Sequence, residues 1–397
     1  MKQVAILGMG MGPATLTVQG LEALEQAEVL LGAPRMLTAL SAYGPKSAYP
    51  AYEPGKVKEI IRESGHARFA VLVSGDTGFF SAAQGLLAAL DQEEVTVLPG
   101  VSCVSYFFAK LRRPWQEAAL VSCHARRENL ADTVRRHPLT FALTGGNVNA
   151  LAGELVEAGF GSLTAILGEN LGAQGERIRS LSVAELADAP VEPLAVLLVE
   201  NPQADARVLS GIPDTAFIRG DVPMTKAEVR AVVLSRLALS PAAVCCDIGA
   251  GTGSVTVEMA LAAYRGRVYA VDHKEEALSL VRENCRRFHL GNVTPVLGKA
   301  PQALEPLPPL DAAFIGGSGG AMREIFQAVL CKNPSARLAV TAIALETLGE
   351  ALQAFREHGI SPQITQLSVA QAKPLGALSM MMAQNPVFIL SGGGPHA

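Results

Sequence analysis

The chain has 397 residues, of which 49% are hydrophobic and 18% charged, so it can build a packed core and is not an intrinsically disordered protein. Its 37 acidic residues outnumber its 33 basic ones, and the net charge of −4 has the wrong sign for a general nucleic-acid-binding protein. Aromatic residues make up only 5%, which argues against an aromatic platform for single-stranded nucleic acid.

At roughly 150 residues per domain, the length predicts two or three domains. No segment approaches the roughly 20 consecutive apolar residues of a membrane-spanning helix, and residues 1–10 lack the basic start of a signal peptide. The six cysteines show no Cys-x-x-Cys spacing and lie mostly in apolar segments. We therefore expect buried thiols, no metal site, no membrane contact and a cytoplasmic location.

In residues 1–205, short apolar runs predict buried strands with helical stretches between several of them. This alternation is typical of a largely parallel sheet in an α/β fold. The predicted strands are 4–7, 69–73, 95–98, 140–143 and 194–199, and the predicted helices are 16–28, 81–90 and 149–158.

Glycine turns follow four of these strands. Because ligands of open α/β sheets bind beyond the carboxyl ends of the strands, we expect the four turns to line one crevice, although ordinary strand-end turns are the alternative. Pro13 replaces the third glycine of a dinucleotide fingerprint and argues against a pyrophosphate site. The turns are Gly8-Met-Gly-Met-Gly-Pro13, Ser74-Gly-Asp-Thr-Gly-Phe-Phe-Ser81, Pro99-Gly-Val-Ser-Cys-Val104 and Leu143-Thr-Gly-Gly-Asn147.

Residues 201–214 lack periodicity and contain two prolines, so we place a domain boundary near residue 205. The second half then repeats the α/β pattern, without detectable sequence similarity to the first. Its predicted strands are 244–248, 267–271, 293–297, 312–315 and 338–341, followed by 364–369 and 378–390, which we expect to add an antiparallel pair to a sheet edge.

The turn Asp247-Ile-Gly-Ala-Gly-Thr-Gly253 is the strongest motif in the sequence. Its alternating glycines permit a tight turn and the close approach of a ligand, and the helix that follows presents free N–H groups. Asp272 ends the next strand, where a carboxylate can accept hydrogen bonds from ribose hydroxyls. Ser254 occupies the last glycine position of a dinucleotide fingerprint, so the pattern favours S-adenosylmethionine. NAD(P) and a plain glycine-rich turn are the alternatives.

Both halves are similar to known methyltransferases. Residues 1–205 resemble the tetrapyrrole methylases, in particular the CbiE-type C5 methyltransferases of corrin biosynthesis. This resemblance rests on the Gly8/Gly10/Gly12 loop, Ser74-Gly-Asp76, Pro99-Gly-Val-Ser102, Pro114-Trp115, Ser122-Cys-His-Ala-Arg126 and Glu169-Asn-Leu-Gly172. Residues 206–397 resemble the CbiT-type class I methyltransferases, which methylate C15 and remove a carboxyl group. Here it rests on Gly211-Ile-Pro213, Phe217–Lys226, Asp247–Gly253, Phe314-Ile-Gly-Gly-Ser318 and Asn385-Pro-Val-Phe388.

The fused arrangement resembles the bifunctional, decarboxylating precorrin-6Y C5,15-methyltransferases (CobL type). It implies a two-lobed α/β tetrapyrrole methylase domain (1–205) followed by a Rossmann-like class I methyltransferase domain (206–397), in a homo-oligomer. One S-adenosylmethionine per domain and an anionic tetrapyrrole substrate are expected. The implied reaction is methylation of reduced precorrin-6 at C5 and C15 with loss of the C12 acetate carboxyl, giving precorrin-8, or its cobalt-containing counterpart.

The motifs and the resemblance together predict the cofactor-binding residues. In the first half these are Gly8, Gly10, Gly12, Gly75, Asp76, Ser102 and Gly145. In the second half they are Asp247, Gly249, Ala250, Gly251, Gly253, Asp272, Gly298, Ala300 and Gly316, with Lys299 standing where the family usually carries Asp. His273 is expected near the ribose. Asn385-Pro-Val-Phe388 lies in the closing strands and is expected to be structural rather than an Asn-Pro-Pro-Tyr-type catalytic motif.

Methyl transfer to an electron-rich carbon needs alignment rather than a strong base. Decarboxylation needs an oriented, partly desolvated carboxylate, and the other substrate carboxylates need cationic partners. Candidate residues for these roles are His124, Arg219, Thr225 and Lys226, with Arg126 and Arg323 as further cations. Each of these cations has solvated surface charge as its alternative role, and His124 a structural one. An RNA or protein methyltransferase, a nicotinamide-dependent reductase and a non-catalytic tetrapyrrole carrier are the alternative functions.

Overall fold

The computed structural model describes residues 1–40, 47–123 and 129–394. Contacts divide the chain into two compact units. One consists of residues 1–127, 139–151 and 163–200, and the other of residues 128–138, 152–162 and 201–397. In the described ranges, every helix is too short or too polar to cross a membrane.

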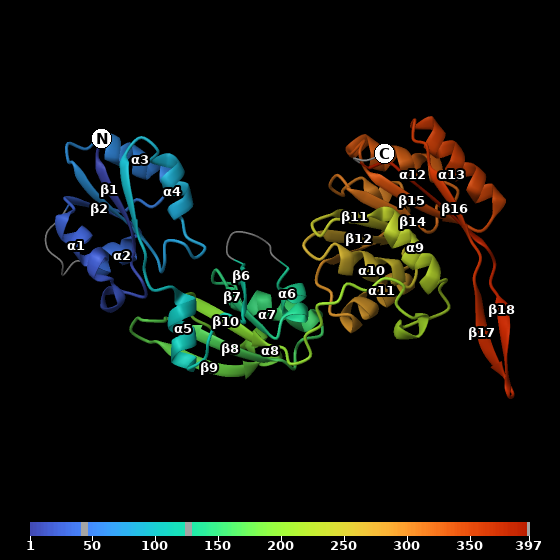
Figure 1. Cartoon of the computed structure of the whole chain (residues 1–397), viewed down its shortest axis with the longest axis horizontal. Coiled ribbons are helices and arrows are strands. Elements are labelled where there is room, and N and C mark those ends of the chain that lie inside the picture. Colours follow the sequence, from blue (N-terminus) through green and yellow to red (C-terminus); the bar gives the residue numbers. More distant parts are fainter. Residues whose placement is uncertain (41–46, 124–128, 395–397) are drawn as a thin grey trace. The chain divides into compact units, whose positions relative to one another are not determined.

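Strands and helices alternate along most of the chain (Figure 1). Up to residue 200 the strands are β1 (Gln3–Gly8), β2 (Val29–Leu31), β3 (Ser47–Tyr49), β4 (Arg68–Val73), β5 (Glu94–Leu98), β6 (Ala119–Ser122), β7 (Leu139–Leu143), β8 (Thr164–Glu169), β9 (Arg177–Ser182) and β10 (Ala195–Glu200). The helices there are α1 (Val18–Gln26), α2 (Pro34–Ala39), α3 (Pro54–Glu63), α4 (Ala83–Ala89), α5 (Cys103–Leu111), α6 (Leu130–Arg136), α7 (Val148–Glu157) and α8 (Val183–Asp188).

Beyond residue 200 the strands are β11 (Val244–Ile248), β12 (Arg267–Asp272), β13 (Val293–Leu297), β14 (Ala312–Ile315), β15 (Arg337–Ala342), β16 (Gln363–Leu367), β17 (Ala370–Leu375), β18 (Leu378–Ala383) and β19 (Val387–Gly392). The helices are α9 (Ala227–Leu237), α10 (Ser254–Ala262), α11 (Glu275–Arg287), α12 (Met322–Lys332) and α13 (Leu345–Glu357). The α/β class predicted from the sequence is confirmed.

The first sheet is entirely parallel, with the strand order β3-β2-β4-β1-β5. Its central strands are continuous apolar runs because helices cover both faces of a parallel sheet, and Phe69–Val73 is buried throughout. Since β4 and β5 are the neighbours of β1, the turns after these three strands lie side by side at the carboxyl ends of the strands.

The second sheet has the order β6-β7-β10-β8-β9 and corrects the prediction of a largely parallel sheet. Only β6 and β7 are parallel, whereas β10 runs antiparallel to both β7 and β8. A buried strand is a continuous apolar run in either orientation, so the sequence pattern did not distinguish the two arrangements. The strands missed in the first half are β2, β3, β6, β8 and β9.

The third sheet has the order β13-β12-β11-β14-β15-β19-β16, and its first five strands are parallel. Neighbouring residues of β11 face opposite sides, so Cys245 packs into the core under α9, α10 and α11, and Cys246 into the core under α12 and α13. β19 and β16 complete the sheet as the expected antiparallel pair. The turn after β11 therefore lies between the ends of β12 and β14.

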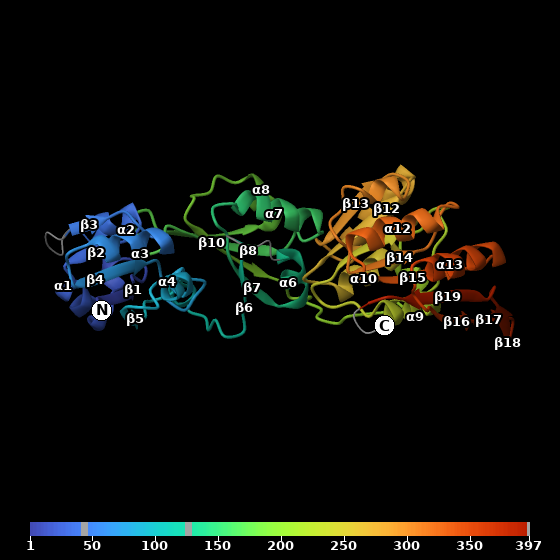
Figure 2. The same cartoon turned by 90° about the horizontal axis from the view of Figure 1, so that it is seen from above.

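The run 378–390, predicted as one strand, is two strands separated at residues 384–386. β18 pairs with β17 in a separate two-stranded hairpin, and β19 returns to the main sheet. Figures 1 and 2 show this hairpin projecting from the second unit. Pro386 lies in the break and has no backbone N–H to donate to a neighbouring strand. This proline is the local feature of the sequence that indicates the break.

The cysteines are less uniformly buried than predicted. Cys245, Cys246 and Cys285 are buried as expected, and Cys103 and Cys123 are half-buried. The prediction of a buried thiol is wrong for Cys331, which is exposed on α12.

Candidate cofactor sites and cavity

Three of the four glycine turns in the first half of the chain meet at the carboxyl ends of the parallel strands. The backbones of Gly10 and Gly75 exchange hydrogen bonds of 3.0 and 3.1 Å. Asp76 accepts bonds from the amides of Gly78 and Gly100 at 2.9 and 3.1 Å. A Cβ on Gly8 would lie 2.7 Å from the Gly100 nitrogen, so only glycine permits this contact between the backbones.

The other predicted residues of the first half lie in different settings. Gly12 adjoins Gly172, whose own Cβ would lie 2.3 Å from the carbonyl oxygen of Met11. Ser102 caps α5, because its hydroxyl accepts a bond from the Ser105 amide at 3.1 Å. Gly145 follows β7 and so belongs to the other sheet of the unit. His124 and Arg126 lie outside the described residues.

Glu176 fixes the loop at Gly172, a contribution that sequence reasoning missed. Its carboxylate accepts bonds from the Tyr106 hydroxyl and the Gly172 amide, both at 2.7 Å, and pairs with Lys110 at 2.6 Å. These partners, with the Lys110 ammonium contributing most, lower the pKa of Glu176 to about 2. The loop is thereby attached to α5, the helix that follows the third glycine turn.

In the second unit, the turn after β11 is held between two strand ends, as the strand order requires. Gly249 and Ala250 donate to the carbonyl of Val271 at 2.9 and 3.1 Å. Asp272 accepts from the Gly251 amide and the Lys274 amide, each at 3.0 Å. The structure therefore brings Asp272 to the glycine turn.

Gly251 shows why this turn needs glycine. Its φ is +56°, a backbone conformation that L side chains rarely adopt. A Cβ there would also lie 2.8 Å from the carbonyl oxygen of Pro223. The turn is thus closely packed under residues 222–223, and Gly253 ends it as the N-cap of α10.

Asp247 is buried at the end of β11. One carboxylate oxygen accepts a bond of 2.5 Å from the Thr256 hydroxyl, and the other has no protein partner among the described residues. Burial raises the pKa of Asp247 to about 7, and the bond from Thr256 lowers it by less than burial raises it. Asp247 therefore joins β11 to α10 and keeps one polar atom for a further partner.

Other predicted residues surround this turn. Gly298 donates to the Asp272 carbonyl at 2.9 Å, and Gly316 donates to the Ile248 carbonyl at 3.0 Å. His273 lies 3.4 Å from the Asp272 carboxylate. Ala300 is half-buried and Lys299 exposed. A site for a nucleoside cofactor with an amino-acid end is expected to have three features: a glycine cradle, a carboxylate for the ribose and a free polar atom nearby. The turn, Asp272 and the unpartnered oxygen of Asp247 supply them, so the residues fit S-adenosylmethionine.

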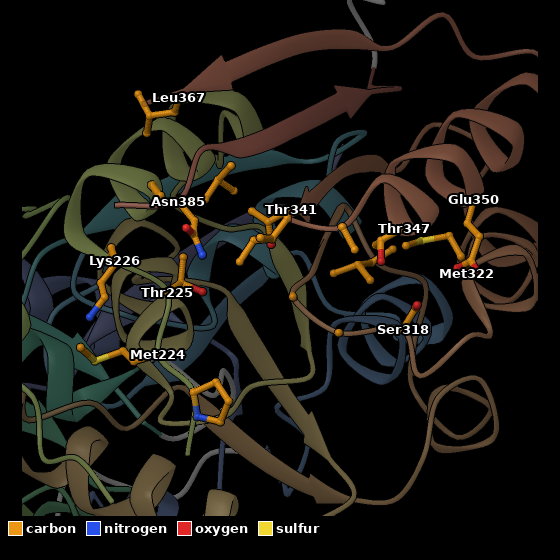
Figure 3. A pocket seen from close by; sticks show the side chains of 18 of the residues that line it. Met224, Thr225, Lys226, Ser318, Met322, Thr341, Thr347, Glu350, Leu367 and Asn385 are labelled. Atoms are coloured by element: carbon orange, nitrogen blue, oxygen red, sulfur yellow. The ribbon is translucent and has the colours of Figure 1, made fainter. Parts of the chain in front are cut away.

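A cavity of about 800 Å³ adjoins the same turn. Pro223 and Gly316 belong to its wall, so it borders the residues packed against the glycine turn. Figure 3 shows Thr225 and Lys226 on one side and Thr347 and Glu350 on the other. Further polar groups come from Ser318, Thr341, Gln384 and Asn385.

The candidate residues of the second half lie in different settings relative to this cavity. Thr225 and Lys226 line it, whereas Arg219 is exposed and lies outside the lining. Arg323 is also exposed and pairs with Glu357 at 2.8 Å. Asn385, expected to be structural, lies in the cavity wall because the break between β18 and β19 places it there. A polar residue in a break between two closing strands was the available sequence signal.

Comparisons with known proteins agree for both halves of the chain. Residues 3–187 match the family model described as Tetrapyrrole (Corrin/Porphyrin) Methylases, and residues 216–392 match the model described as Precorrin methyltransferase domain. A precorrin-6Y C(5,15)-methyltransferase [decarboxylating] from Sinorhizobium sp. is 30% identical over 396 residues, covering 97% of this chain and 94% of the relative.

Two further relatives each cover just under half of this chain. A probable cobalt-precorrin-6B C(15)-methyltransferase (decarboxylating) from Pyrobaculum calidifontis is 44% identical over 184 residues, covering 46% of this chain and 94% of the relative. The solved precorrin-6y C5,15-methyltransferase of Geobacter metallireducens is 36% identical, covers 46% of this chain and 97% of its own, and has a TM-score of 0.45.

The two family matches define an S-adenosylmethionine-dependent methyltransferase. Because the Sinorhizobium relative aligns over nearly the whole of both chains, the chain belongs to the family of decarboxylating precorrin-6Y C5,15-methyltransferases.

Substitution of Asp272 tests its place in the cofactor site. We expect Asp272→Ala to weaken binding of S-adenosylhomocysteine in the second half by about 1–3 kcal/mol, because ribose hydroxyls would lose their acceptor. Isothermal titration calorimetry measures this loss. Asp311→Ala is the matched control, since that carboxylate likewise accepts a bond from a backbone amide, that of Val244, at the end of β11 opposite to the glycine turn. Equal affinity in both variants would contradict the assignment.

Asp247 gives a prediction about pH. Its pKa rises from 3.8 to about 7 on folding, so between these values the folded state binds more protons than the unfolded state. The contribution of Asp247 to the stability of the ligand-free protein should therefore fall as pH rises through this window. Asp247→Asn cannot titrate, so its unfolding temperature relative to that of the unsubstituted protein should rise between pH 5 and pH 8. A constant difference in thermal unfolding would refute the shift.

Proposed function

We propose that this enzyme methylates reduced precorrin-6 (precorrin-6Y/6B) at C5 and C15 and removes the carboxyl group of the C12 acetate, giving precorrin-8. The observation that carries the proposal is the alignment of both halves, in the same order, with the full-length Sinorhizobium enzyme. We assign C5 methylation to a domain of residues 1–205 and the decarboxylating C15 methylation to residues 206–397. The family matches ending at 187 and beginning at 216 support this boundary.

A cobalt-containing precorrin is the second candidate substrate. It is favoured by the relative named as a probable cobalt-precorrin-6B C(15)-methyltransferase, which is 44% identical over 184 residues. The reactions on the macrocycle are the same in both cases, so the proposed roles of the residues do not change. A cytoplasmic location stays a prediction from the sequence.

S-adenosylmethionine supplies an activated methyl group, and the protein's task is to align the donor with an electron-rich carbon and to exclude water. The glycine turns at residues 8–12 and 249–253 are the proposed cofactor cradles. The close backbone packing at Gly8 and Gly251 supports this role, because it leaves the loops little freedom to move. His124 stays a candidate for proton transfer in the first domain.

The cavity of the second unit is the proposed place for the part of the macrocycle that bears C15 and the C12 acetate. Its wall supplies hydroxyl and amide groups, with Lys226 as the single cation and Glu350 as the single anion among the described lining residues. Thr225 and Lys226 are the proposed contacts to substrate carboxylates. Loss of CO2 leaves on the acetate CH2 an electron pair that the conjugated ring accepts, and a proton from water then converts this CH2 to a methyl group.

Mass spectrometry of the product tests the reaction. With reduced precorrin-6 and S-adenosylmethionine, the product should carry two additional methyl groups and lack one CO2. Transfer of methyl groups to RNA or protein, without change in the tetrapyrrole, would overturn the proposal. Parallel assays with the cobalt-containing and cobalt-free substrates distinguish the two candidates by their kcat/KM values.

Two separate cofactor sites give a further prediction. Calorimetry with S-adenosylhomocysteine should find two sites per chain. Gly251→Val should remove one site together with C15 methylation, and Gly10→Val should remove the other together with C5 methylation, since a Cβ at Gly10 would lie 2.4 Å from the Thr15 hydroxyl oxygen. A single site that is lost in Gly251→Val alone would make the first domain a scaffold.

We also propose a homo-oligomer that forms through the β17–β18 hairpin. All residues of both strands are exposed, including Leu375, Leu378 and Met381. An isolated hairpin of two strands is marginally stable in water, and exposed apolar side chains favour association. Met381→Glu should therefore lower the molar mass measured by light scattering. Val18→Glu, at a similarly exposed position of α1, should leave the mass unchanged; equal masses for both variants would contradict this interface.

A further inference from the structure

The segment 211–226 is attached to the second unit by a fully buried arginine. Arg230 of α9 has an exposed fraction of 0%. Its guanidinium pairs with Glu258 of α10 at 2.8 Å and with Asp214 at 2.9 Å. It also donates to the carbonyl oxygens of Ile212 and Thr225. Arg230 thus binds both ends of the segment.

Stability alone does not account for this arrangement. Burying an arginine and a glutamate costs several kcal/mol of desolvation per ion, and well-packed apolar residues of similar volume often serve equally well or better. Apolar contacts have no preferred direction, whereas a planar guanidinium fixes each hydrogen-bond acceptor at a defined angle. The buried network therefore indicates a requirement for the exact placement of the residues it holds.

Asp214 connects this network to the cavity. One of its carboxylate oxygens pairs with Arg230, and the other lies 3.3 Å from the Lys226 ammonium. Lys226 is the cation of the described lining, and Thr225, whose carbonyl Arg230 holds, is its neighbour in the wall. The position of the ammonium group therefore depends on an aspartate that Arg230 orients.

Charge gives a second reason for the coupling. Arg230 and Lys226 are balanced by Glu258 and Asp214, so the cluster is neutral as a whole. Without the Arg230 charge, the cluster would be net negative beside the cavity and would repel carboxylates. An anionic ligand thus needs Arg230 even though Arg230 does not reach the cavity surface.

We propose that Arg230 is a positioning residue that sets the affinity of the cavity for a substrate carboxylate by fixing Lys226 through Asp214 and the Thr225 carbonyl. The inference rests on the proposed function for the nature of the substrate. It goes beyond that function because Arg230 lies outside the cavity and yet controls the position of Lys226, the residue that contacts the substrate.

A double-mutant cycle tests the coupling. Arg230→Lys keeps the charge but loses the planar guanidinium. We expect it to raise KM for reduced precorrin-6 in the C15 step roughly tenfold, because one charged hydrogen bond is lost, and to change kcat less. In a Lys226→Met background, the same substitution should change KM by a much smaller factor, because only the contact through Thr225 is then left to disturb. Equal fold-changes in both backgrounds would overturn the proposal, since a general structural defect acts independently of Lys226.

Two controls identify a defect of folding. C5 methylation by the same chain should be unchanged in Arg230→Lys. Arg135→Lys alters another buried arginine, which pairs with Asp132 at 2.8 Å, and should leave C15 kinetics unchanged. Where Arg230→Lys does not fold, Asp214→Asn replaces it in the cycle, because the Asp214 side chain is 26% exposed and tolerates the change more readily.

Hydrogen–deuterium exchange gives a readout that does not require turnover. Amides of residues 224–226 should exchange faster in Arg230→Lys than in the unsubstituted protein and in Arg135→Lys. Unchanged exchange would show that Arg230 does not hold the segment, and would overturn the inference whatever the enzyme does. Absence of C15 methylation by the unsubstituted protein, with faster exchange in the variant, would instead count against the proposed function alone.

Discussion

Backbone packed directly against backbone is the constraint on which both candidate sites depend. At Gly8 the chain approaches the Gly100 amide, and at Gly251 it approaches the Pro223 carbonyl, at distances that exclude a Cβ. The first contact brings the ends of the neighbouring strands β1 and β5 together, and the second brings the turn after β11 against the loop that precedes α9. The peptide groups of both turns are thereby held in fixed positions, which suits them to hold a cofactor in one orientation.

The second unit combines this rigid cradle with a cavity that contains few charges. Among the described lining residues, Lys226 and Glu350 are the charged groups, and hydroxyl, amide and apolar groups make up the rest. Methyl transfer from a cation to a neutral carbon removes charge at the reacting centre, so strong fixed charges would not favour it. Loss of CO2 likewise disperses a negative charge into the ring, and a wall of mainly neutral groups does not oppose this dispersal.

The sequence predicted the core of the fold well because buried strands are continuous apolar runs. The strands β1, β4, β11, β12 and β14 and the glycine turns after β1, β4 and β11 were found this way. The antiparallel direction of β10 was not, because apolar runs carry no information about the direction of the partner. Short or exposed strands such as β3 and β17 were missed for a related reason, since they bury too little to show a pattern.

The candidate sites were predictable where a local motif carries them. Asp272 follows from the strand that it ends, and Thr225 and Lys226 from the resemblance. Arg230 and Glu258 lie 28 positions apart on two helices, and each is an ordinary charged residue in its own helix. Only the packing of α9 against α10 makes them a pair. Asn385 reaches the cavity because the β17–β18 pair inserted before it changes the path of the chain; Pro386 marks the break locally, but not the position of Asn385 beside the cavity.

The β17–β18 hairpin is closed at its base by the bond from the Gln384 amide to the Val369 carbonyl, at 2.9 Å. The strands β16 and β19, on either side of it, pair with each other directly. The main sheet is therefore complete without the ribbon, and residues can be added to or removed from its tip at little more than the entropy of closing a loop. Evolution could therefore vary the reach of this arm from one relative to the next, while the cavity wall at its base kept its shape.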